Sequence, residues 1–140
     1  MKVGILSFQG SFLDHSKSIL SIGATPVLIK NEADIYDLDA LILPGGESTA
    51  MKKIDSYSKV FSVLDDFIKS GKPTLSTCAG TILLAKDVIG GDTTIPNIDI
   101  QVTRNAYGRQ TESFEGSVSF YDNNDICLLY TSPSPRDTRE

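Results

Sequence analysis

The chain is 140 residues long with a mass of 15.2 kDa, and 40% of its residues are hydrophobic and 22% charged, which is typical of one globular domain and excludes collagen-like, disordered and disulfide-scaffold proteins. Its formal net charge of −5 and pI near 4.8 disfavour a nucleic-acid partner, because proteins that bind nucleic acids present basic surface to the phosphates. A mean hydropathy of −0.06, the lack of an apolar stretch long enough for a membrane span and the lack of a leader at Met1 predict a cytoplasmic protein with no membrane partner.

The apolar pattern predicts strands and helices in alternation. In chain order we expect a strand at residues 2–8, a helix at 12–20, strands at 25–29 and 39–43, a helix at 60–69, a strand at 73–77, a helix at 79–88, and half-buried or edge strands at 98–103 and 116–121. Such alternation is typical of α/β proteins, in which helices cover both faces of a mostly parallel sheet. We therefore predict an α/β fold of this kind.

The end of the chain does not continue this pattern. From Cys127 the sequence reads Cys-Leu-Leu-Tyr-Thr-Ser-Pro-Ser-Pro-Arg-Asp, which resembles the translation of a transposase-type sequencing adapter. The alternative is a natural tail rich in proline and serine. We predict that residues 1–126 are native and that residues 127–140 are a non-native tail, which leaves Cys127 without a function.

Cys78 is the first candidate for chemistry. It lies between a predicted buried strand and a predicted helix, and such a turn places a side chain at the carboxyl edge of a parallel sheet. The start of a helix favours a thiolate and offers the Ala79 N–H to a developing oxyanion. The alternative is the common role of a lone cysteine as a small buried hydrophobic residue.

A glycine-rich loop is expected at the same edge. Leu-Pro-Gly-Gly-Glu-Ser-Thr follows the strand at 39–43, and Gly45 and Gly46 would let the backbone turn sharply and present N–H groups, beside Glu47 and Ser48. The same residues also suit a simple turn followed by a helix cap. The sequence contains neither a Walker loop nor a G-x-G-x-x-G fingerprint, so a phosphate-binding module ranks last among the interpretations.

Two further features complete the set of candidates. Gln9 and Gly10 end the first predicted strand at this edge. His15 is the only histidine of the chain, and a solvated or capping role suits it better than a catalytic one. A cysteine hydrolase ordinarily needs an imidazole to move protons, and nothing in the sequence links His15 to Cys78.

Taken together, these segments resemble one family, the glutaminase subunits of pyridoxal 5′-phosphate synthase, which are triad-type, class I glutamine amidotransferases with a flavodoxin-like fold. The resemblance covers residues 1–121 and is carried by Gln9-Gly10, by Leu41 to Thr49, by Thr77-Cys78-Ala79-Gly80, and by Arg104-Asn105-Ala106-Tyr107-Gly108-Arg109-Gln110. The cysteine turn and the Pro-Gly-Gly loop are shared with other amidotransferases, whereas Gln9-Gly10 combined with the segment from Arg104 is more specific.

The resemblance implies a reaction and a set of roles. Cys78 would attack the side-chain amide of L-glutamine, form a glutamyl thioester and release ammonia, with the N–H groups of Gly46 and Ala79 as the oxyanion donors. The glutamine would be held by Gly46, Glu47, Ser48 and Arg104, since a guanidinium binds a carboxylate through two parallel N–H groups. The ammonia would pass to a synthase subunit that makes pyridoxal 5′-phosphate. No metal and no cofactor are implied for this chain.

The sequence departs from the family at its carboxyl end. The family's catalytic His and Glu lie in a later His-Pro-Glu segment that is absent here, so we expect an incomplete fold and negligible glutamine hydrolysis by the 140-residue chain. Two alternatives remain. One is the glutaminase subunit of a different amidotransferase, in which Cys78 keeps its role, and the other is a non-catalytic scaffold subunit with the same fold.

Overall fold

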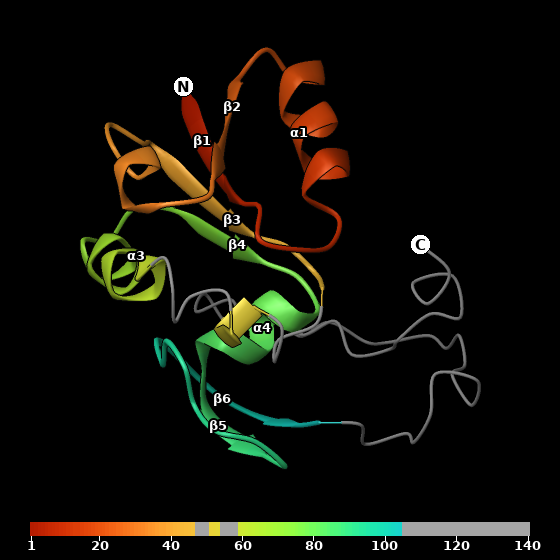
Figure 1. The fold of residues 1–140 in the computed structure, drawn as a ribbon, viewed down its shortest axis with the longest axis vertical. Helices are drawn as coiled ribbons and strands as arrows, with labels where there is room; N and C mark the ends of the chain where they lie inside the picture. The colour runs from red at the N-terminus through yellow and green to blue at the C-terminus, as the bar shows by residue number, and fades with distance from the viewer. Residues whose placement is uncertain (47–50, 54–58, 105–140) are drawn as a thin grey trace, which may run out of the picture.

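The computed structural model describes residues 1–46, 51–53 and 59–104, and its largest feature is a parallel sheet (Figure 1). β1 (Lys2–Leu6) lies between β2 (Thr25–Ile29) and β3 (Ala40–Leu43), and β4 (Thr74–Ser76) pairs with the other side of β3. The strand order β2-β1-β3-β4 is that of flavodoxin-like sheets. It confirms the predicted parallel sheet.

Helices cover both faces of this sheet. α1 (Phe12–Ser21) packs on one face, where Ile42 belongs to the same core cluster as Ile19, while α3 (Val60–Lys69) and α4 (Ala79–Leu84) pack on the other, where Leu41 and Leu43 contribute. Successive side chains of a strand point to opposite faces, so an unbroken apolar run such as β3 is buried on both sides. Figure 1 shows α1 and α3 on opposite sides of the strands. No helix in the described ranges is long and apolar enough to cross a bilayer.

A second, two-stranded sheet follows α4 and corrects one prediction. The helix expected at residues 79–88 ends at Leu84, and β5 (Ala85–Ile89) pairs in parallel with β6 (Ile98–Thr103). The helical spacing of the apolar residues was misleading because pairing with β6 satisfies the backbone of β5. β6 alternates half-buried and exposed residues, as predicted. The strand predicted at 116–121 lies outside the described residues.

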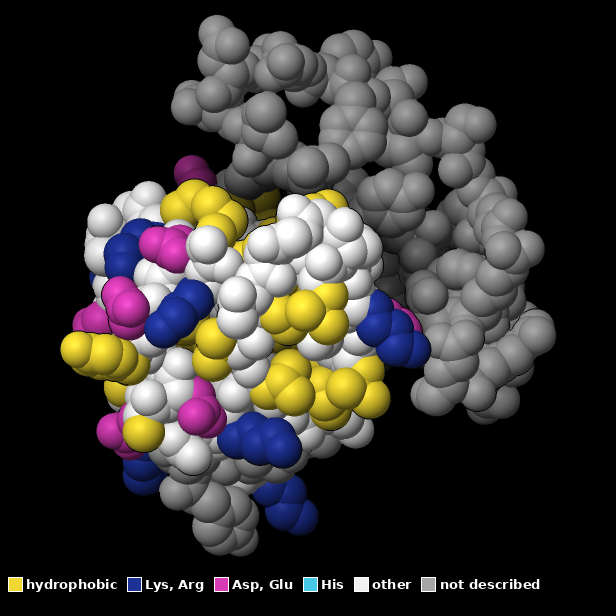
Figure 2. Space-filling view, turned by 90° about the horizontal axis from the view of Figure 1, so that it is seen from above, with side chains coloured by type: hydrophobic (Ala, Val, Ile, Leu, Met, Phe, Trp, Pro, Cys, Tyr) yellow, Lys and Arg dark blue, Asp and Glu magenta, His cyan; other side chains and the backbone are white. Residues whose placement is uncertain are grey.

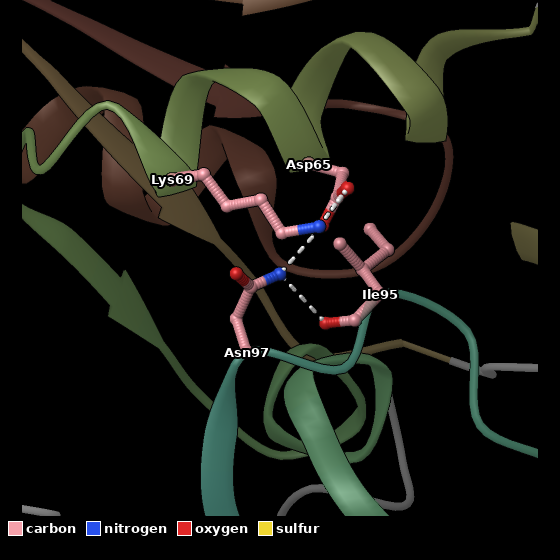
Figure 3. Close-up of polar contacts among 4 residues, drawn as sticks. All are labelled: Asp65, Lys69, Ile95 and Asn97. Atoms are coloured by element: carbon pink, nitrogen blue, oxygen red, sulfur yellow. Dashed lines mark hydrogen bonds and ion pairs between the residues drawn. The ribbon is translucent and has the colours of Figure 1, made fainter.

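A polar cluster joins α3 to the segment before β6 (Figure 3). Lys69 Nζ donates to one carboxylate oxygen of Asp65 at 2.7 Å, and Asn97 Nδ2 donates to the other at 2.8 Å and to the Ile95 carbonyl at 3.2 Å. The hydrogen bonds from Lys69 and Asn97 favour the ionised form and lower the pKa of Asp65 below its usual value. A short 3₁₀ turn, η1 (Glu32–Asp34), follows β2.

Candidate active site

Cys78 occupies the turn between β4 and α4, as the sequence predicts. The residue is exposed and its thiol is free, so it is not the buried cysteine of the alternative interpretation. Its backbone has φ 49° and ψ −116°. A positive φ in a residue other than glycine costs about 1–3 kcal/mol, which the surrounding structure must offset, and such strain is typical of functional turns. A nucleophile at the top of an α/β sheet is presented by this kind of strand-to-helix turn.

Leu43, at the end of β3, contacts the backbone on both sides of this turn. The Thr77 N–H donates to the Leu43 carbonyl at 3.0 Å, which extends the pairing of β3 and β4 past the end of the strand. Gly80 lies so close to Leu43 that a Cβ on it would collide with the same carbonyl oxygen. A glycine at position 80 therefore lets α4 start directly against β3, and this close approach fixes where Cys78 lies.

The glycine loop after β3 lies directly against Cys78. A Cβ built on Gly45 would lie 3.2 Å from the Cβ and 3.9 Å from the Sγ of Cys78, so only hydrogen separates the Gly45 backbone from the cysteine side chain. The Gly45 carbonyl accepts a hydrogen bond from the Ser11 N–H at 3.4 Å. Because a trans peptide is planar, the N–H of Gly46 points in the direction opposite to that carbonyl, away from Ser11.

The loop between β1 and α1 meets the same glycines. Gly10 has a φ of 91°, and a Cβ on it would collide with the Gly45 carbonyl oxygen. Gly46 lies beside the Gln9 carbonyl and the methyl group of Met51, because a Cβ on it would be 3.2 Å from the Gln9 oxygen and 2.6 Å from the Met51 Cε. The structure thus brings together the loops after β1, β3 and β4 at the carboxyl edge of the sheet, as predicted. The edge between β1 and β3 is where flavodoxin-like sheets bind their ligands.

The predicted glutamine-binding residues are only partly described. Glu47 and Ser48 lie outside the described residues. Arg104 follows β6, where its N–H donates to the Ile89 carbonyl at 3.0 Å, and its side chain packs against Gly91 in the turn after β5. These contacts lie at the carboxyl end of the β5–β6 pair, whereas α4 adjoins the amino end of β5. They therefore do not group Arg104 with Cys78, and the role of Arg104 stays a prediction.

His15 lies on α1 and is half-buried, with its backbone N–H bonded to the Ser11 carbonyl at 3.3 Å. Within residues 1–46, 51–53 and 59–104, no three His, Cys, Asp or Glu residues are grouped so that they could hold a metal ion.

One feature of the turn was missed in the sequence. The hydroxyls of Ser76 and Thr81 are 3.0 Å apart and partly buried, so they join the end of β4 to the first turn of α4. Serine and threonine placed on either side of a strand-to-helix turn were a possible signal, but hydroxyl residues are too common in turns for the spacing alone to stand out.

Comparisons with known proteins give a matching family and similar relatives. The family described as SNO glutamine amidotransferase matches residues 5–130. A curated relative in Bacillus cereus named pyridoxal 5′-phosphate synthase subunit PdxT is 49% identical over 121 residues, and one of the same name in Bacillus thuringiensis is 47% identical over 120 residues. Each alignment covers 85% of this chain and 61% of the relative, so the chain spans about three fifths of their length.

Solved structures give the same fold. A crystal structure of a glutamine amidotransferase superposes with a TM-score of 0.72 at 34% identity and covers 81% of this chain and 62% of that one. A putative peptidase E protein from Listeria monocytogenes, at 13% identity and a TM-score of 0.54 over 61% of this chain and 50% of that one, shares the fold alone. The match over residues 5–130, together with the cysteine turn facing a glycine loop, shows that this chain belongs to the SNO glutamine amidotransferase family.

Proposed function

We propose that Cys78 is the nucleophile of a glutaminase and that the whole protein hydrolyses L-glutamine to L-glutamate and ammonia. The observation that carries the proposal is the exposed, strained Cys78 set against the Gly45 backbone, in a chain of the glutamine amidotransferase family. A solely structural cysteine would need neither the exposure nor the strain.

The reaction proceeds in two displacements. The Cys78 sulfur, as thiolate, adds to the side-chain amide carbon of glutamine, the C–N bond breaks, and the nitrogen takes up a proton and leaves as ammonia. Water then adds to the thioester carbonyl and the C–S bond breaks, which yields glutamate and returns the thiol. No oxidant or cofactor enters this balance.

Each addition puts negative charge on the amide oxygen. We assign the N–H groups of Gly46 and Ala79 as the hydrogen-bond donors to that oxygen. Ala79 is the first residue of α4, where an N–H has no partner within the helix. The N–H of Gly46 points away from the loop that the Gly45 carbonyl faces. Two N–H groups that point to the same oxygen stabilise the negative charge on it.

Substrate binding and proton transfer need further groups. Gly46, Glu47, Ser48 and Arg104 are the proposed glutamine-binding residues, with Arg104 on the carboxylate. The proton carriers are the His and Glu that the family resemblance places in a later segment, and His15 has no part. The same resemblance supports delivery of the ammonia to a synthase subunit for pyridoxal 5′-phosphate synthesis, in the cytoplasm.

The test compares the product of the complete gene with the 140-residue chain. Reading the DNA past the codon for Ile126 shows whether residues 127–140 are native and whether a His-Pro-Glu segment follows. We expect the complete product, with its synthase partner, to release ammonia and glutamate from glutamine, and to form γ-glutamyl hydroxamate when hydroxylamine intercepts the thioester. The 140-residue chain and Cys78→Ser should do neither. An intact gene product that lacks the segment and shows no turnover would support a scaffold subunit instead.

A further inference from the structure

The hydroxyls of Ser76 and Thr81 meet across the turn that carries Cys78. Ser76 is the last residue of β4, two positions before Cys78, and Thr81 lies in the first turn of α4, three positions after it. Their oxygen atoms are 3.0 Å apart and both side chains are partly buried. This contact therefore links the entry of the turn to its exit.

The turn needs such a link because its own elements are short. β4 has three residues and α4 has six, so neither is rigid by itself. The Gly80 N–H bonds to the Thr77 carbonyl at 2.9 Å and the Thr81 N–H to the Cys78 carbonyl at 3.0 Å, and these bonds close the turn through the backbone alone. A strained residue keeps its conformation only where surrounding contacts over-determine it.

We infer that the Ser76–Thr81 hydroxyl pair holds Cys78 in the orientation that keeps its side chain against the glycine loop. The inference rests on the proposed function, since it concerns the geometry of the same nucleophile. The pair acts through the backbone of the turn, so both are positioning residues. A displaced nucleophile loses rate steeply, because covalent attack depends on a near-attack geometry.

Four variants separate this role from plain stability. Thr81→Val removes one hydroxyl and keeps the branched shape, Ser76→Ala removes the other, and the double variant removes both. Thr81→Ser restores the hydroxyl. The matched control is Ser62→Ala on α3, which removes an exposed hydroxyl that bonds to the Lys59 carbonyl at 3.3 Å, remote in sequence from the turn.

The measurement is the rate of Cys78 alkylation in the complete gene product, with a chloroketone analogue of glutamine and, in parallel, with iodoacetamide. We expect each single variant to react about tenfold more slowly with the analogue, and the double variant to react no more slowly than the singles, because the two hydroxyls serve one another. Thr81→Ser and Ser62→Ala should react like the unmodified protein. Iodoacetamide does not have to bind in the glutamine site before it reacts, so it should alkylate Cys78 at similar rates in all the variants. All rates are measured at a temperature below the unfolding midpoint of every variant.

Two outcomes would overturn the inference alone. One is an unchanged rate with the analogue in Thr81→Val, and the other is equal slowing with both reagents, which would mean that the thiol itself has become less reactive and that its position relative to the bound analogue has not changed. If the analogue does not label Cys78 even in the unmodified protein, the proposed function fails, and the inference fails with it.

Discussion

Single residues set the spacing around Cys78. A Cβ on Gly10 would collide with the carbonyl oxygen of Gly45, in the loop after β3, and a Cβ on Gly80 would collide with that of Leu43, the last residue of β3. Backbone atoms cannot rotate out of the way as a flexible side chain can. A methyl group added at either position must therefore move the backbone.

Comparing Gly10→Ala with Gly23→Ala separates the effect of a collision of the added methyl group from the effect of a positive φ. Gly10 has a φ of 91° and Gly23 one of 81°, but nothing lies within 4 Å of a Cβ at Gly23. We expect Gly23→Ala to lower the free energy of unfolding by about 1–2 kcal/mol through φ alone, and Gly10→Ala to lower it further because the Gly45–Gly46 loop must shift. Urea denaturation of both variants measures this. Equal losses would show that the close contact of Gly10 with Gly45 is not present in solution.

At the scale of elements, the apolar pattern of the sequence predicted the bounds correctly where an element buries one of its faces. The predicted ranges 25–29, 60–69 and 98–103 are the bounds found for β2, α3 and β6. The error at β5 arose because an apolar stripe that begins in α4 continues past Leu84, while the partner strand that changes its structure lies further along the chain. Local periodicity contains no information on such pairing.

The link between α3 and the segment before β6 predicts a dependence on pH. The pKa of Asp65 is lowered in the folded chain, so its carboxylate stabilises the fold above its unfolded pKa of about 3.9, and this stabilisation disappears as the pH falls through the lower, folded value. We expect Asp65→Asn to reduce the free energy of unfolding at pH 7 and to reduce it less at pH 3, which lies below the unfolded pKa. Urea denaturation at the two pH values measures the difference, with Asp66→Asn, an exposed neighbour on α3, as control. The same loss at both pH values would contradict the assignment.

At the scale of the whole molecule, parallel topology explains why much of the site could be predicted. The carboxyl ends of parallel strands share one edge, so Gly10, Gly46 and Cys78 could be grouped once their strands were recognised. The position of Arg104 could not, because it depends on the separate β5–β6 pair, whose placement the sequence pattern does not define. Glu47 and Ser48 were assigned from family resemblance alone.

The central claim is that the sulfur of Cys78 attacks a glutamine amide. It is tested most directly by treating the complete gene product with the chloroketone analogue of glutamine and mapping the adduct by peptide mass spectrometry. We expect a single adduct, on Cys78, whose formation L-glutamine suppresses. An adduct on another residue, or labelling of Cys78 that an excess of L-glutamine leaves unchanged, would contradict it.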